Sequence, residues 1–219
     1  IPTAHLHLRC EFHSPIKNPV KIAFERESTR AVIASKTKWL YHVDQSMNVT
    51  SKVRISEFPV SDLKLADFGY KSKVAVAACY DGTVKLWRCG TRDCYSSFRA
   101  ECTFTDAQNP LLFGINNFSN KIVTGRNGIQ FYDMKNQKLI SSWSTPSRVT
   151  AIALHPGNEN LCVVGMMSGS VNCFDLRMKE KMSIDFGKII SVGVNEPITK
   201  IKTNRFLFSY HLLNFELSL

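Results

Sequence analysis

The chain has 219 residues, 44% of them hydrophobic and 21% charged, with a formal net charge of +10 at pH 7. This length suits one substantial core or two small ones, and the apolar content excludes a disordered chain. No run of about eighteen apolar residues occurs, so no transmembrane helix is expected. Residues 1–9 lack the order of a signal peptide. Because the first residue is Ile1 and not Met, we expect a processed product or an excerpt of a longer protein.

Short runs of alternating apolar and polar residues, rich in Val, Ile and Phe, follow one another along the chain. Turn-forming Gly, Asn, Asp and Pro residues separate them, which is typical of strands. No segment keeps the helical spacing of apolar residues over three turns. The sequence therefore predicts an all-β protein. The clearest predicted strands are residues 20–24, 73–78, 83–87, 121–124, 129–132 and 171–174.

Three segments align as a repeat: residues 74–87, 121–133 and 161–175. Each consists of a predicted strand, a tight turn with glycine, and a second strand that closes on an aromatic residue. The closing residues Trp87, Tyr132 and Phe174 lie 45 and 42 residues apart. A large apolar side chain at this point can pack between neighbouring sheets, and a sheet with two apolar faces needs a neighbour on each side.

The turns of the three repeats are Asp81-Gly82, Asn127-Gly128 and Ser168-Gly169. Asp and Asn side chains bond their own backbone in turns, and glycine adopts positive φ without steric cost. We therefore expect each glycine, or an adjacent turn residue, to have positive φ.

These segments resemble the WD40 repeat family, whose four-stranded blades recur every 40 to 45 residues and close on Trp-Asp. Here the dipeptide is Trp87-Arg88, Tyr132-Asp133 and Phe174-Asp175, and the Gly-His pair of the family is absent from the sequence. The hydrogen-bond network of the family, His–Ser/Thr–Trp–Asp, therefore cannot form in full. Two weaker matches, Val43-Asp44 and Phe215-Glu216, lack the turn glycine.

The resemblance implies a WD40-type β-propeller of four-stranded antiparallel blades. We predict a single propeller region over residues 1–219, with four to five blades visible and the ring incomplete. The predicted blades are residues 16–57, 58–104, 108–144, 146–186 and, in part, 187–219.

The predicted function is a non-catalytic scaffold or adaptor for other proteins in a multiprotein complex, by analogy with the family. Nucleotide-binding, serine hydrolase and metalloprotease motifs are absent from the sequence, so we expect no enzyme, catalytic residue, cofactor or metal. His5, His7 and His13, with Cys10 between them, are interpreted as polar alternation in a β-segment. His42 and Asp44 are interpreted as residues that cap a strand.

Two groups of residues are candidates for binding a partner. The segment 174–177 resembles the box by which WD40 substrate receptors of cullin-4 ubiquitin ligases contact the ligase adaptor. Asp175 and Arg177 are the candidate contacts, although Ser168 stands where that box prefers an acidic residue. The second group joins Arg and aromatic side chains, which suits a protein interface or single-stranded nucleic acid. Its members are Arg88, Arg92, Tyr95, Phe98 and Arg99.

The net charge of +10 leaves a nucleic-acid or nucleoprotein factor as the alternative function. The basic residues are dispersed, however, which also fits an ordinary solvated surface; the densest group is only Lys179-Glu-Lys181. Seven cysteines occur without CxxC pairs, and Cys79, Cys162 and Cys173 lie in apolar runs, so we expect reduced core thiols. That composition favours a cytoplasmic or nuclear protein.

Overall fold

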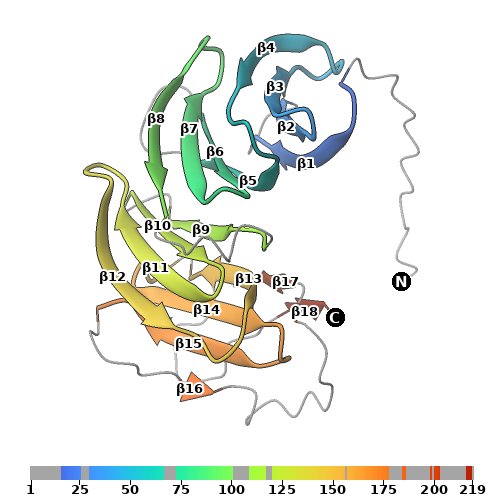
Figure 1. The fold of residues 1–219 in the computed structure, drawn as a ribbon. Coiled ribbons are helices and arrows are strands. Elements are labelled where there is room, and N and C mark those ends of the chain that lie inside the picture. The colour runs from blue at the N-terminus through green and yellow to red at the C-terminus, as the bar shows by residue number, and fades with distance from the viewer. Residues whose placement is uncertain are drawn as a thin grey trace.

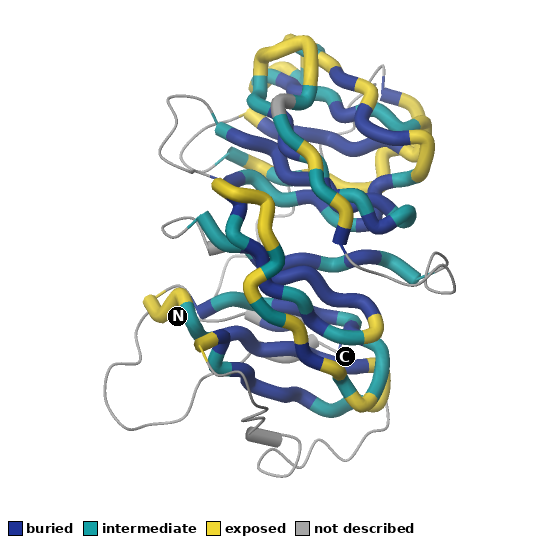
Figure 2. Tube along the Cα trace, turned by 60° about the vertical axis from the view of Figure 1, so that its left-hand side comes forward, coloured by how far each residue is buried: buried dark blue, intermediate teal, exposed yellow. Residues whose placement is uncertain are grey.

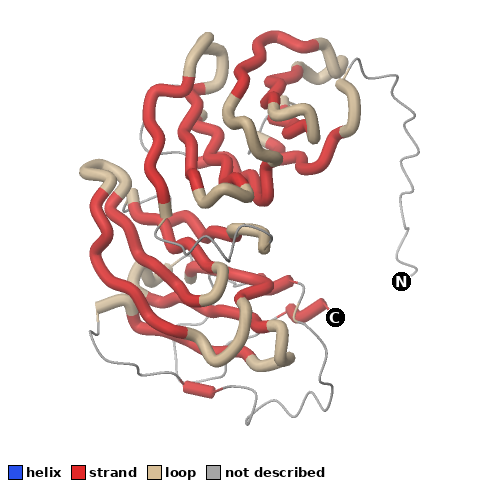
Figure 3. The backbone as a smooth tube through the Cα atoms, in the orientation of Figure 1, coloured by secondary structure: helices blue, strands red, loops and turns tan. Residues whose placement is uncertain are grey.

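The computed structural model describes residues 16–25, 30–66, 73–100, 109–116, 120–155, 157–177, 184–185, 198, 200–202 and 216–218. Every regular element within these ranges is a β-strand, which confirms the all-β prediction for this part of the chain (Figures 1 and 3). None of the described residues belongs to a helix capable of crossing a membrane. Several residues named in the sequence analysis lie outside the described ranges: His5, His7, Cys10, His13, Lys179, Lys181 and Phe215.

Within these ranges the strands form four antiparallel four-stranded sheets and one two-stranded sheet, and each strand of a four-stranded sheet pairs with its successor in the chain. The first sheet contains β1 to β4: Pro19–Phe24, Ala31–Ser35, Trp39–Val43 and Val49–Arg54. The second contains β5 to β8: Val60–Ala66, Val74–Cys79, Thr83–Arg88 and Cys94–Arg99. The third contains β9 to β12: Leu112–Asn116, Lys121–Gly125, Gly128–Asp133 and Lys138–Ser144.

The fourth sheet contains β13 to β16: Val149–Leu154, Leu161–Met166, Val171–Asp175 and Ile184–Asp185. The fifth pairs β17, Lys200–Lys202, with β18, Glu216–Ser218. Each four-stranded sheet lies within one of the four full segments into which the sequence was divided. Successive sheets are linked along one edge, because β1 lies against β5, β5 against β9, β9 against β13 and β13 against β17. The described strands do not close into a ring (Figure 1).

The sheets stack because their second strands are apolar on both faces. In β6, Val76 packs toward the third sheet, while its neighbour Ala77 packs toward the first. The alternation has the period of two that a strand imposes on its side chains. The fourth strands β4 and β12 carry several exposed residues, and Figure 2 shows buried segments running through the middle of the stack. The core is therefore a series of apolar layers between sheets.

Trp87, Tyr132 and Phe174 occupy the same place in three successive sheets. Each lies in the third strand, opposite the second residue of the second strand, and is 0%, 3% and 1% exposed, respectively. Each packs in the apolar layer shared with the preceding sheet. In the first sheet, Val43 is buried on the face turned away from the second sheet. His42, beside it, meets the ring of Trp87 edge-on at a centroid distance of 6.5 Å.

The turn glycines divide into two kinds. Gly82 and Gly169 have φ of +86° and +78°, as expected for tight turns between the second and third strands. The expectation was wrong for Gly128, because neither it nor Asn127 has positive φ. Gly128 is the first residue of β11, and a Cβ there would lie 2.8 Å from the carbonyl oxygen of Trp143. Glycine is needed at this position for the close approach of β12.

Candidate functional site

In each sheet a turn joins the third strand to the fourth, and we call this turn a corner. The corner begins just after the closing position of the repeat, which Trp87, Tyr132 and Phe174 occupy in the second, third and fourth sheets. In the third and fourth sheets the next residue is an aspartate, Asp133 or Asp175, and in the first sheet an aspartate, Asp44, directly follows β3. In each case Oδ1 accepts the backbone N–H of the residue two positions later, at 2.9, 2.8 and 3.0 Å, respectively. This is the side-chain-to-backbone bond by which aspartate shapes a turn. The repeated aspartate therefore builds the corner. For Asp44 this fits the capping interpretation.

The fourth corner presents a forked ion pair. Nε of Arg177 donates to Oδ1 of Asp175 at 2.9 Å, and Nη2 donates to Oδ2. The Arg177 side chain is 66% exposed and that of Asp175 is 25% exposed. The hydrogen bonds from Arg177 lower the pKa of Asp175, and the carboxylate in turn raises the pKa of Arg177. An exposed guanidinium is thus held in one orientation by its own sheet.

Ser168 does not join this pair. It lies in the turn between β14 and β15, at the opposite end of β15 from Arg177. Its Oγ bonds the hydroxyls of Ser147 and Ser170 at 3.0 and 2.7 Å. Ser168 therefore does not help to orient Arg177.

The second corner is built differently, because Arg88 replaces the aspartate. Nε1 of Trp87 donates to the carbonyl oxygen of Thr91 at 2.9 Å, and the N–H of Thr91 donates to the carbonyl of Arg88 at 3.0 Å. Gly90, with φ of +94°, allows the chain to reverse there. The residue between Arg88 and Gly90 is Cys89, which is half-buried.

The Arg and aromatic residues around this corner do not form one patch. Arg88 is half-buried, whereas Arg92 is exposed in the corner itself. Phe98 packs on Tyr132 of the third sheet, with the centroids of the two rings 4.8 Å apart. Arg99 lies at the far end of β8, where its Nη2 donates to the carbonyl oxygen of Asp81 at 3.3 Å. The side chain of Tyr95 is outside the described part of the chain.

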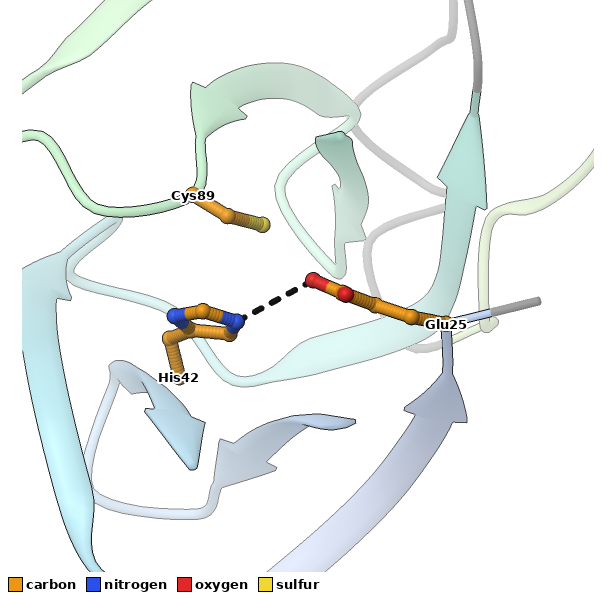
Figure 4. A group of neighbouring side chains, drawn as sticks. All are labelled: Glu25, His42 and Cys89. Atoms are coloured by element: carbon orange, nitrogen blue, oxygen red, sulfur yellow. Dashed lines mark hydrogen bonds and ion pairs between the residues drawn. The ribbon is translucent and has the colours of Figure 1, made fainter. Parts of the chain in front are cut away.

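A cluster that sequence reasoning missed lies between the first and second sheets (Figure 4). It contains Glu25, which directly follows β1, His42 of β3 and Cys89, which directly follows β7. One ligating atom from each side chain lies within 4.8 Å of the other two, and His42 Nε2 is 3.1 Å from Glu25 Oε1. Imidazole nitrogen, carboxylate oxygen and thiolate sulfur are all ligand types used by Zn²⁺.

The surroundings of this cluster fix its histidine and keep its thiol protonated. Thr50 Oγ1 lies 3.0 Å from His42 Nδ1 and 3.0 Å from the carbonyl oxygen of His42. The side chains of His42 and Glu25 are only 9% and 10% exposed. Burial, and secondly the charge of Glu25, raise the pKa of the Cys89 thiol to about 12.

The five cysteines in the described ranges are free thiols, as expected. Burial raises the pKa of Cys79 and of Cys173 to about 11, and it also raises the pKa of Cys94 and Cys162. Cys162 and Cys173 belong to the apolar layers on the two sides of the fourth sheet. They act as small core side chains.

No protein-family model and no curated protein matches the chain. The resemblance to WD40 repeats therefore depends on the residues of the repeat and on the sheets that they form.

Proposed function

We propose that this chain forms part of a WD40-type β-propeller and serves as a non-catalytic scaffold for other proteins. The observation that carries the proposal is the stack of four-stranded sheets in chain order, linked through their first strands. Trp87, Tyr132 and Phe174 repeat one buried position through the stack. Propeller blades require this arrangement, since each sheet buries both faces only against its neighbours.

A stack of this kind suits binding because its rigid strands hold the corners in place. Loops on a rigid frame can recognise a partner at small entropic cost. Arg177 suits this purpose, since the fork to Asp175 leaves it exposed yet oriented. A planar guanidinium presented in this way can bind a carboxylate of a partner through two hydrogen bonds.

Capture of partners with a matched pair of variants tests the scaffold function. Arg177→Ala removes the oriented guanidinium, and Arg54→Ala removes another exposed arginine, which is paired with Glu57 at 2.9 Å. We expect wild type and Arg54→Ala to capture the same proteins and Arg177→Ala to lose at least one of them. Capture of no specific partner by the wild type would contradict the scaffold function.

The second candidate is a substrate receptor of a cullin-4 ubiquitin ligase, favoured by the exposure of Arg177 and its fork to Asp175. Co-precipitation of the ligase adaptor tests this function. The adaptor should appear with wild type and disappear with Arg177→Ala while the variant stays folded. If the wild type brings down no adaptor, the receptor function fails and the general scaffold is unaffected.

A further inference from the structure

We propose that Glu25, His42 and Cys89 form a zinc site that links the first sheet to the second. Two ligands come from the first sheet, at the end of β1 and within β3, and the third comes from the corner of the second sheet. Figure 4 shows the three side chains converging on one point. An ion held there would join two sheets that otherwise meet through apolar side chains.

The spacing of the ligand atoms is close to what zinc requires. Zn–N and Zn–O bonds of about 2.0 Å and a Zn–S bond of about 2.3 Å place tetrahedral ligand atoms roughly 3.2–3.6 Å apart. His42 Nε2 and Glu25 Oε1 already stand 3.1 Å apart. All three ligand atoms lie within 4.8 Å of one another, so the Cys89 sulfur needs to move by roughly 1.4 Å at most. The second oxygen of Glu25 or a water molecule completes the coordination.

The hydrogen bonds of His42 leave Nε2 directed at this point. The hydroxyl of Thr50 has one proton, and the carbonyl oxygen of His42 can only accept it. His42 Nδ1 also lies 3.0 Å from this hydroxyl oxygen, so Nδ1 donates the hydrogen bond between them. With Nδ1 protonated, a neutral His42 points a lone pair at the carboxylate of Glu25 from 3.1 Å. Either a proton or a metal ion must separate them, and a metal-bound histidine whose other nitrogen donates to a fixed group is the usual arrangement in proteins.

The charge of the three ligands favours a divalent ion. Binding Zn²⁺ displaces the thiol proton of Cys89 to solvent and leaves one thiolate, one carboxylate and one neutral imidazole around the ion. Two negative charges then balance the two positive charges, in a place where the side chains of Glu25 and His42 are at most 10% exposed. A sulfur and a nitrogen ligand select zinc over Mg²⁺ or Ca²⁺, which prefer oxygen alone. Because the ion lies between two sheets, its expected role is to hold them together.

Metal content of the purified full chain tests the proposal. After dialysis against metal-free buffer, the wild type is expected to retain one zinc per chain by mass spectrometry. Replacement by Co²⁺ should produce a thiolate-to-cobalt charge-transfer band. Cys89→Ser should lose both the zinc and the band, and Glu25→Gln should bind at least tenfold more weakly. Cys94→Ser, at a half-buried thiol outside the cluster, is the matched control and should keep both.

Wild type without zinc and without a thiolate band on cobalt addition would overturn the proposal, and so would a band that survives in Cys89→Ser. The wild-type measurement decides the question even if a variant fails to fold. A chelator should also lower the unfolding temperature of the wild type and leave that of Cys89→Ser unchanged. An equal response of the two proteins would contradict the link between the sheets.

Discussion

The corners after β15 and β7 occupy the same position of the repeat and do opposite things. After β15, Asp175 accepts the N–H of Arg177 and directs the guanidinium outward. After β7, Arg88 stands in place of the aspartate, and the turn is closed by the indole of Trp87 bonding Thr91. The two corners differ at both residues of the repeat dipeptide, Trp87-Arg88 against Phe174-Asp175, and the corner after β7 has a bond to its own core where the corner after β15 has an exposed pair.

Cys89 stands at the corner position that Met134 and Leu176 occupy in the third and fourth sheets, and all three side chains lie toward the preceding sheet. With the corner held by Trp87 and Gly90, the thiol lies beside Glu25 and His42 of the first sheet. In the fourth corner the residue at the same position is Leu176, which is buried against the preceding sheet through apolar contacts, and the closing side chain is Phe174, which cannot donate a hydrogen bond. Trp87 is therefore both a core residue and the anchor of its corner.

The largest effect is expected for Trp87→Ala, which should lower the free energy of unfolding by about 3–5 kcal/mol, the range for a buried aromatic residue. Loss of the indole removes packing between two sheets and the bond to Thr91 together. Denaturant unfolding measures the change. Trp39→Ala, at a partly exposed tryptophan of β3, is the control and should cost clearly less. Equal losses would contradict the assignment of Trp87 to the layer between sheets.

Gly90→Ala tests whether the corner after β7 depends on the positive φ of Gly90. A Cβ at this position would meet no atom within 4 Å, so the cost comes only from φ of +94°. We expect a loss of roughly 1–2 kcal/mol in the free energy of unfolding, the usual penalty for an L-residue in the left-handed region. An unfolding midpoint equal to that of the wild type would contradict the corner geometry.

Asp133→Ala tests the aspartate corner without an ion pair. Asp133 Oδ1 accepts the N–H of Lys135 at 2.8 Å, and Oδ2 accepts the side-chain amide of Asn136 at 3.1 Å. Removing these bonds should destabilise the protein by about 1 kcal/mol. Asp93→Ala, an exposed aspartate of the second corner, is the control and should have little effect. If the two variants unfold alike, the carboxylate does not shape the third corner.

The smallest effect on stability is expected for Arg177→Gln, because the pair is exposed. The change should instead raise the pKa of Asp175, which the arginine lowers by hydrogen bonding. Since the folded pKa is depressed, the pair stabilises the fold above the unfolded value of about 3.9. That contribution disappears as the pH falls through the folded pKa. An NMR titration of Asp175 measures the shift, and an unchanged pKa would contradict the fork.

The repeat could be predicted from sequence because its parts are local. Strand alternation and the spacing of Trp87, Tyr132 and Phe174 already imply equivalent places in successive sheets. Gly82 and Gly169 follow from turn chemistry alone. For Gly128 the expected reason, a positive φ, was wrong. Glycine is required there because of the close contact with Trp143 on the adjacent strand β12. A single sequence does not show such a contact.

The cluster between the first two sheets could not be predicted for a related reason. Residues 25, 42 and 89 have none of the short spacings that mark a zinc site. They meet only because the register of β2 and β3 turns His42 toward the second sheet, while the corner after β7 places Cys89 opposite. Arg88 in place of the repeat aspartate sets this corner apart from the others, but it does not indicate a ligand.

The most direct test that Cys89 is turned inward is alkylation of the native Arg177→Cys variant, in buffer with a chelator, followed by peptide mass spectrometry. Residue 177 is exposed in its corner, so its new thiol should react as fast as a free thiol. Cys89, with a pKa raised to about 12 by burial and by Glu25, should react at least about a hundredfold more slowly until the protein unfolds. Equal rates at the two positions would show that the corner after β7 does not turn inward, and would contradict this account.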